Sequence, residues 1–156
     1  MSLIDLGKTA KPCLVSCSVL KEELEKLVKQ GDLDVDLVFV SKYFHVDYEV
    51  LKKNLRKVVE NRLSHPQGGI ILVYGDLCLG PNDEMKKLTE EYGITKVDAL
   101  NCVDCLLGGK GKVLEADPYH ELLFSCPGMI DFFNHLKEIA QQENVDEESF
   151  NKLFAG

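Results

Sequence analysis

The chain has 156 residues, and 45% of them are hydrophobic, which suits one domain with a sizeable core. Its 18 Lys and Arg stand against 26 Asp and Glu, and the net charge of -8 argues against nucleic-acid binding and against docking on an anionic membrane. No apolar run approaches the roughly 20 residues that span a bilayer, and the first residues do not resemble a signal peptide, so we expect a soluble cytoplasmic protein.

Apolar runs that suit buried strands alternate with amphipathic helical periods along the chain. The first elements are expected as strands at residues 12–19, 33–44, 69–74 and 94–100, with helices at 21–30, 48–64 and 81–92 between them. A fifth strand is expected at 122–125, followed by a helix at 129–142 and a last short helix capped by Asp146. This alternation predicts a single α/β domain over residues 1–156: a three-layer, mostly parallel, Rossmann-like sheet with helices on both faces.

Six cysteines are many for a cytoplasmic protein, where grouped thiols more often bind metals or perform redox chemistry than form disulfides. Five of them follow the carboxyl end of a predicted strand, as does one histidine, and only Cys13 lies near the start of one. The carboxyl ends of parallel strands meet at one edge of a sheet, where ligands bind in such folds. The residues expected together at that edge are Cys17, His45, Cys78, Cys102, Cys105 and Cys126.

Thiolates accompanied by one imidazole favour a transition metal, either zinc or the iron of an iron–sulfur cluster. A closed set of four ligands would be structural, whereas three ligands and an open position would suit catalysis. The alternative is that each free cysteine is a small apolar residue packed in the core. The favoured ligands are Cys17, His45, Cys78 and Cys105, with Cys102 and Cys126 in reserve.

Cys102 and Cys105 form a C-x-x-C pair, which suits either a metal site or a thioredoxin-like dithiol. The pair is expected to begin a helical turn, where the helix N-terminus would lower a thiol pKa. It follows the fourth predicted strand, and Asn101 precedes it in place of the usual Gly-Pro-containing motif, so we favour the metal. A dithiol oxidoreductase and a module that binds a small ligand without metal are the alternatives, and whether the protein is an enzyme stays open.

The stretch from Gly75 to Gly80 has the glycine spacing of a phosphate-binding loop after a strand. A Pro-Asn pair replaces the Lys and Ser or Thr that such a loop needs, so nucleotide hydrolysis is disfavoured, but the loop can still present backbone amides to a cofactor. Asp104, between the two thiols, is expected to orient a histidine or act as a base at such a site, or to cap a helix. Residues 108–112 are expected as an exposed turn or as a lid over the cysteines.

Several short motifs, taken in order, resemble the domain-of-unknown-function family 1638 over residues 14–136. The family pattern has a cysteine before a helix that contains Glu-Leu, and a Leu-His pair before the next helix. A Tyr-Gly pair near a cysteine and a glycine comes next, then an Asp-Cys pair with apolar residues and a glycine, and finally Pro-Gly-Trp. The matching residues are Cys17 with Glu23 and Leu24, Phe44 with His45, Tyr74 and Gly75 with Cys78 and Gly80, Asp104 and Cys105 with Gly108, and Pro127 with Gly128.

The chain departs from that pattern at three positions. Val103 replaces a His, Met129 replaces the Trp, and Cys78 stands one residue further along than usual. The extra thiols of Cys102 and Cys126 are candidates to take over for the missing groups. The resemblance implies no established activity, but relatives are often encoded beside corrinoid-dependent methyltransferase systems of anaerobes. It therefore implies partners in such systems and a link to methyl transfer.

Overall fold

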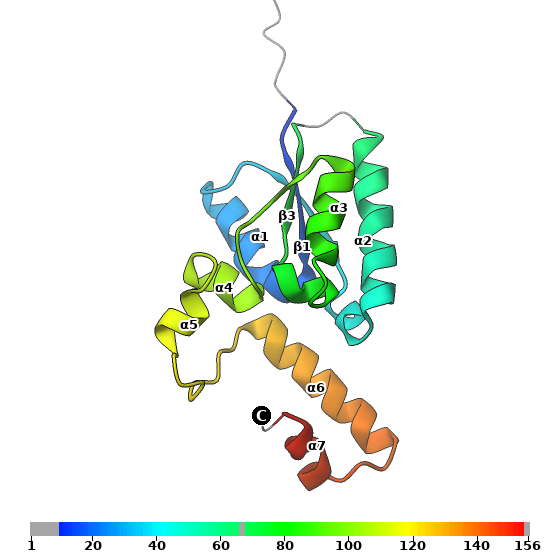
Figure 1. Cartoon of the computed structure of the whole chain (residues 1–156), viewed down its shortest axis with the longest axis vertical. Coiled ribbons are helices and arrows are strands. Elements are labelled where there is room, and N and C mark those ends of the chain that lie inside the picture. The colour runs from blue at the N-terminus through cyan, green and yellow to red at the C-terminus, as the bar shows by residue number, and fades with distance from the viewer. Residues whose placement is uncertain (1–9, 66–67, 155–156) are drawn as a thin grey trace, which may run out of the picture.

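A computed structural model describes residues 10–65 and 68–154 and contains one parallel sheet with helices on both faces (Figure 1). The four strands lie in the order β2-β1-β3-β4. Their bounds are β1 (Cys13–Cys17), β2 (Asp36–Val40), β3 (Ile70–Val73) and β4 (Thr95–Lys96). The predicted three-layer α/β fold is therefore confirmed. Within the described residues, no helix has the length and apolar character needed to cross a membrane.

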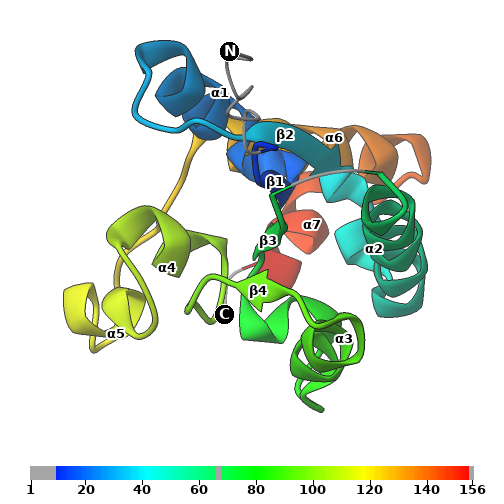
Figure 2. The same cartoon turned by 90° about the horizontal axis from the view of Figure 1, so that it is seen from above.

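The crossover helices divide between the two faces of the sheet (Figure 2). Helix α1 (Lys21–Gln30) lies on one face, and α2 (Tyr48–Leu63) and α3 (Glu84–Tyr92) lie on the other. The chain moves outward from β1 to β2 and then back past β1 to β3, so right-handed crossovers place α1 and α2 on opposite faces. The point at which the strand order reverses lies between β1 and β3, where ligands bind in such sheets.

The helix ends follow the signals in the sequence. Gly31, at a φ of 81°, ends α1 in the left-handed conformation that favours glycine. The Asp47 carboxylate accepts hydrogen bonds from the Glu49 and Val50 N–H groups at the start of α2. Because the structure follows these signals, α1 ends and α2 begins where the sequence predicts.

The two faces of the sheet are covered unequally. Val15 and Leu72, which pair across β1 and β3, are fully buried on the face that packs against α2 and α3. Their neighbours Leu14 and Ile71 point to the opposite face, where α1 lies and where Ile71 is only half-buried. The core is therefore centred between the sheet and the α2–α3 layer, and the α1 face is less completely covered.

Short helices gather at the carboxyl edge of the sheet. Three 3-10 turns follow the first three strands, namely η1 (Ser18–Leu20), η2 (Lys42–Val46) and η3 (Asp76–Leu79). After β4 come α4 (Cys102–Leu107), α5 (Lys112–Ala116), α6 (Pro127–Gln142) and α7 (Glu147–Phe154). Helix α6 begins against η1 and extends away from the sheet together with α7 (Figure 1).

Two glycines allow backbones to approach closely at this edge. A Cβ atom on Gly75 would lie 2.2 Å from the Leu100 carbonyl oxygen, and one on Gly128 would lie 2.0 Å from the Val19 carbonyl oxygen. Any side chain at either position would push the two segments apart. Gly75 thus brings η3 against the segment before α4, and Gly128 brings the first turn of α6 against η1.

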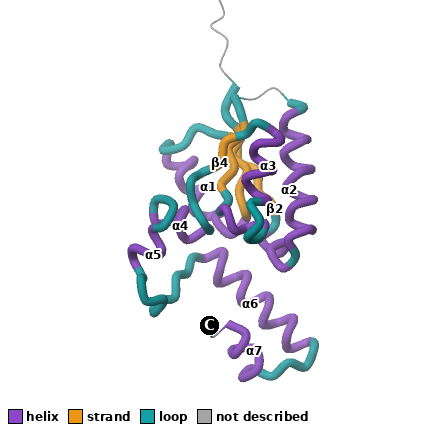
Figure 3. Tube along the Cα trace, viewed as in Figure 1, coloured by secondary structure: helices purple, strands orange, loops and turns teal. Residues whose placement is uncertain are grey.

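The fifth strand predicted at residues 122–125 is wrong. That segment is a loop between α5 and α6 (Figure 3), and Leu123 is 95% exposed. The apolar residues there have a strand-like composition, but the Glu121 and Leu122 N–H groups donate to the Asp117 carboxylate and not to a neighbouring strand. Hydrogen bonding inside the loop therefore overrides local strand propensity.

The fourth strand is shorter than predicted. It ends at Lys96, although the Val97 N–H still donates to the Leu72 carbonyl oxygen at 3.0 Å. The Asp98 carbonyl then accepts a hydrogen bond from Lys110, so the chain leaves the sheet for the loop that carries α4 and α5.

Replacing Gly128 by Ala tests the close approach of α6. Alanine is about 1 kcal/mol better than glycine inside a helix, so local propensity alone predicts stabilisation. We expect instead a loss of about 1–3 kcal/mol in the free energy of unfolding, because the added Cβ displaces the Val19 backbone. Urea denaturation followed by circular dichroism measures it. An unchanged or higher stability would contradict the close approach.

Candidate functional site

The carboxyl ends of β1 and β3 bring a thiol, an imidazole and a phenol together. Cys17 is the last residue of β1, and its Sγ lies 3.7 Å from Nδ1 of His45 in η2. Tyr74 follows β3 directly, and its ring stacks on that of His45 with centroids 6.1 Å apart and planes 13° apart. The pairing of Ser16 with Val73 places Cys17 and Tyr74 side by side.

Three further thiols approach Cys17 from η3 and α4. Cys78 lies in η3, and Cys102 and Cys105 lie one helical turn apart in α4. Ionisation of Cys78 or Cys102 would raise the pKa of Cys17, and ionisation of Cys78 or Cys105 would raise the pKa of Cys102. These mutual interactions show that the thiols predicted at this edge do share one region, which we call the thiol centre.

Cys126 reaches the same region by a route that the sequence did not indicate. It precedes the first turn of α6, and its thiol donates to the Val19 carbonyl oxygen at 3.5 Å. Its charge also acts on Cys102. Cys13, in contrast, is buried at the amino end of β1, where Arg62 and Asp36 are its charged neighbours, so it lies apart from the thiol centre as predicted.

The thiols of Cys17, Cys78, Cys102 and Cys105 are protonated at physiological pH. Burial raises the pKa of Cys17 and of Cys102 to about 12 and that of Cys78 to about 11. Burial also raises the pKa of Cys105. The expectation that the start of α4 lowers a thiol pKa in the pair Cys102 and Cys105 is therefore wrong, because desolvation outweighs the favourable backbone contribution.

His45 is also neutral, since burial lowers the pKa of its imidazole. Nδ1 lies 3.3 Å from the Lys42 carbonyl oxygen and 3.7 Å from the Cys17 Sγ. It either donates to the carbonyl or accepts the thiol proton, depending on the tautomer. A neutral imidazole beside a thiol is the protonation state that a metal ligand requires.

Tyr74 carries a buried polar group without a partner. The residue is 2% exposed, and its hydroxyl has no hydrogen-bond partner among the described residues. Desolvation raises the pKa of this hydroxyl well above its ordinary value, and the charges of Cys17 and Cys78 act in the same direction. Such a group costs about 1–3 kcal/mol when it is left unsatisfied, so its position marks a place where a further polar group or ion would be stabilising.

An apolar pocket of about 290 Å³ opens onto Cys17 and His45. Cys102 lines one side of it, and Met129 and Phe132 of α6 form the other. The sequence analysis named Tyr74 and Met129 only in comparison with the family motifs, and it did not place either of them, Phe132 or Lys42 at the site. The position of Tyr74 directly after a strand was the available signal, because every residue in that place reaches this edge.

No three His, Cys, Asp or Glu side chains are arranged to hold a metal ion as they stand in residues 10–65 and 68–154. The contact between Cys17 and His45 is the part of the centre already at a ligand-like separation. A tetrahedral zinc ion, with bonds of about 2.3 Å to sulfur and 2.0–2.1 Å to nitrogen, places those two atoms about 3.6 Å apart.

The predicted cofactor-binding glycines have packing roles in the structure. The loop between Gly75 and Gly80 donates several of its amides within the chain, including those of Asp76 to Ala99 at 2.8 Å and of Leu77 to Leu100 at 3.1 Å. Gly80, at a φ of 92°, packs against the Tyr48 ring. These contacts occupy the donors that a phosphate would need.

Asp104 organises the loop that follows the C-x-x-C pair. The residue is 1% exposed, and its carboxylate accepts hydrogen bonds from the N–H groups of Leu100, Gly111 and Val113 at 2.9–3.1 Å. Burial acts to raise the pKa of Asp104, but these hydrogen bonds outweigh it and hold the pKa below its usual value. The carboxylate thus fixes residues 108–113 in place and faces backbone amides.

A family model described as a protein of unknown function, DUF1638, matches residues 39–156. The match includes His45, Cys78, the C-x-x-C pair and Cys126, whereas Cys17 and the Glu-Leu motif of the first helix lie before it. No curated protein and no solved structure gave a match. Because the matched region covers most of the sequence, the chain belongs to the DUF1638 family, a family of unknown function.

Proposed function

We propose that the thiol centre binds a transition metal, and that this metal is the functional group of the protein. The ligands are drawn from Cys17, His45, Cys78 and Cys105, with Cys102 and Cys126 in reserve. The observation that carries the proposal is the convergence of several thiols and a neutral imidazole from five separate segments onto one buried edge of the sheet.

The unsatisfied Tyr74 hydroxyl supports the fit. Cys17 and Cys78 are close enough to influence its pKa electrostatically, and a metal-bound thiolate would be able to accept the hydrogen bond that this hydroxyl lacks in the described residues. The separation of 3.7 Å between Cys17 Sγ and His45 Nδ1 is also close to that of two ligands on one zinc ion. For the remaining cysteines the proposal requires rotation about χ1, which has three staggered positions.

The metal would supply a positive charge that keeps these thiols deprotonated at neutral pH and a Lewis acid next to the apolar pocket. The protein's own residues do the rest. Burial keeps water from the sulfur atoms of Cys17 and Cys126, Tyr74 holds His45 in place by stacking, and Met129 and Phe132 restrict the pocket to small apolar groups.

Zinc and an iron–sulfur cluster both suit this donor set. A thiolate-rich zinc site beside a small apolar pocket is compatible with transfer of a methyl group. We therefore keep the association with corrinoid-dependent methyltransferase systems as part of the proposal, with proteins of those systems as the partners. Its support is the family resemblance, and the pocket lined by Met129 and Phe132 agrees with it in size and polarity.

The dithiol alternative has less support. An exchange-active dithiol needs a thiolate fraction near neutral pH. Burial raises the pKa values of both Cys102 and Cys105, which removes that fraction. The apolar pocket also supports the other alternative, a site that binds a small ligand without metal. The metal content of the protein distinguishes this alternative from the metal proposal.

Metal analysis of protein purified without oxygen tests the proposal. We expect zinc or iron near one site per chain in the wild type. Cys17→Ser, Cys78→Ser and Cys105→Ser should each lower metal affinity at least tenfold, because each removes a thiolate ligand. Elemental analysis, sulfide determination and competition with a chromogenic chelator provide the measurement.

The matched control is Cys13→Ser, which removes a buried thiol at the opposite end of the same strand. It should bind metal as the wild type does. The unfolding transition of each variant shows whether the fold is intact. Wild-type protein that binds neither zinc nor iron, or three folded cysteine variants with unchanged affinity, would refute the metal site.

The buried thiols also predict how stability depends on pH in metal-free protein. Unfolded thiols lose their protons near pH 8.5, whereas those of Cys17, Cys78 and Cys102 keep them until about pH 11–12. Above pH 8.5 the folded state therefore binds more protons than the unfolded state, so the free energy of unfolding falls as pH rises. The limiting slope is about 1.4 kcal/mol per pH unit for each thiol.

Urea unfolding at pH 8, 9 and 10 in the presence of a chelator measures this slope. Cys17→Ser should reduce it by the share of one thiol, because serine does not titrate in that range. A stability that is constant between pH 8 and 10 would show that the thiols are not desolvated as described.

A further inference from the structure

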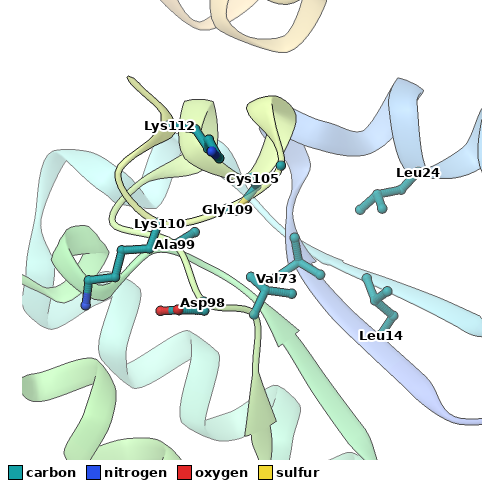
Figure 4. Close-up of a pocket in the computed structure, with 11 residues that line it drawn as sticks. Leu14, Leu24, Val73, Asp98, Ala99, Cys105, Gly109, Lys110 and Lys112 are labelled. Carbon is teal, nitrogen blue, oxygen red and sulfur yellow. The ribbon is translucent and has the colours of Figure 1, made fainter. Parts of the chain in front are cut away.

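A second, larger pocket lies on the other side of α4, over the incompletely covered face of the sheet (Figure 4). Its volume is about 670 Å³, within the range of about 300–1,000 Å³ that is typical of small-molecule sites. Leu14 of β1 and Val73 of β3 form its floor, and Leu24 of α1 forms one side. The apolar surface of these residues runs from Leu14, near the amino end of β1, to Val73 at the carboxyl end of β3, the two strands between which the strand order reverses.

The opposite wall leaves space where side chains would otherwise fill the pocket. It consists of Ala99 and the glycines at 108 and 109. A Cβ on Gly109 would meet only the Asp98 carbonyl oxygen, at 3.5 Å. The Asp104 carboxylate holds this loop in position through its backbone hydrogen bonds. This wall of the pocket is thus a hydrogen-bonded loop in which Gly108 and Gly109 contribute no side chains.

The size of the pocket favours a small molecule over a protein segment. A helix with its side chains is about 10–12 Å across and rises 1.5 Å per residue. A volume of 670 Å³ therefore accommodates fewer than two helical turns, which is too little for a partner helix to dock. A small organic molecule with an apolar body matches both the volume and the lining.

The charges at the rim favour an anion. Lys112 and Lys110 line the pocket together with one exposed acid, Asp98. Lys110 pairs with Asp76 at 2.9 Å, and Lys96 pairs with the same carboxylate at 2.8 Å, so the two lysines exceed Asp76 by one positive charge, which offsets Asp98. The Lys112 ammonium pairs with Glu115 at 2.6 Å, but both side chains are substantially exposed. An ion pair of this kind contributes little, so Lys112 can turn to a ligand at small cost. A cation at the mouth of an apolar pocket suits the acidic group of an amphiphile.

We propose that this pocket binds a small amphiphilic organic acid, with its apolar body on Leu14, Leu24 and Val73 and its acidic group at Lys112. Cys105 lines the same pocket, so the bound molecule lies against a thiol that also belongs to the thiol centre. Only this last connection rests on the proposed metal function, because the pocket and its charge do not depend on a metal.

Binding of octanoate to the full chain, compared with octylamine and 1-octanol, tests the ligand class. These probes share an eight-carbon body and differ in the charge of the head group. We expect octanoate to bind at least tenfold more tightly than octylamine, with the alcohol between them, as measured by titration in protein-observed NMR. Octanoate should also slow alkylation of Cys105 by N-ethylmaleimide, measured by mass spectrometry of the labelled peptide.

Two variants locate the site. Val97→Phe fills the pocket from a half-buried position and should weaken octanoate binding more than tenfold. Lys112→Glu should weaken it about fivefold to tenfold, because attraction is replaced by repulsion. Lys57→Glu makes the same charge change at an exposed position of α2, on the opposite face of the sheet from the pocket, and should leave octanoate binding unchanged.

The outcomes separate this inference from the metal proposal. Octanoate binding that survives in folded Val97→Phe protein, or a preference for octylamine that Lys112→Glu leaves unaltered, would overturn the inference. Metal content is measured in the same variants and should stay unchanged, since neither residue is a candidate ligand. Wild-type protein that binds neither zinc nor iron but binds octanoate at this pocket would refute the metal proposal and leave the ligand site standing.

Discussion

The parallel pairing of β1 with β3 is the constraint on which the rest of the molecule depends. Its register sets Ser16 opposite Val73, so the next residues, Cys17 and Tyr74, leave the sheet side by side. Every other contribution to the thiol centre is placed relative to this pair. A shift of one residue would turn Cys17 from the α2 face to the α1 face and separate it from His45.

Burial of several thiols at one edge is stable only while they are uncharged. A neutral thiol behaves as a small apolar group, so Cys17 and Cys126 contribute to the core as well as to the candidate site. Removal of the thiol protons places negative charge in a region that Lys42 reaches from the pocket and Lys96 reaches from the side of Cys78 and Cys105. The same thiols therefore stabilise the fold when they are protonated and require a counter-charge when they are deprotonated.

Much of this arrangement was predictable from the sequence, because it follows from topology and not from detailed packing. Alternating strands and helices predict that Cys17, His45 and Cys78 follow strand ends and meet at one edge, and the structure places them there. Cys126 arrives from the start of a helix, so its position was right although the strand assigned before it was wrong.

Other features depend on tertiary contacts that no local pattern encodes. The apolar residues around Leu123 have strand propensity, yet the loop uses Asp117 as its hydrogen-bond acceptor. Desolvation of Cys102 is a property of the assembled core, and it outweighs the helix start that the sequence does indicate. Likewise, the close approach at Gly75 becomes visible only when the Leu100 backbone is placed against it.

Helix α6 is anchored at the carboxyl edge of the sheet by its first turn and extends away from it. It has 16 residues, so it is a rod roughly 24 Å long, held at its first turn by η1 and by the pairing of Lys42 with Asp131. Met129 and Phe132, which close the smaller pocket, lie within two turns of that anchor, while the far part of α6 packs against α7. Because α6 is one continuous helix, the residues that line the pocket and those that pack against α7 share a single rod, and a displacement of its far end would also move Met129 and Phe132.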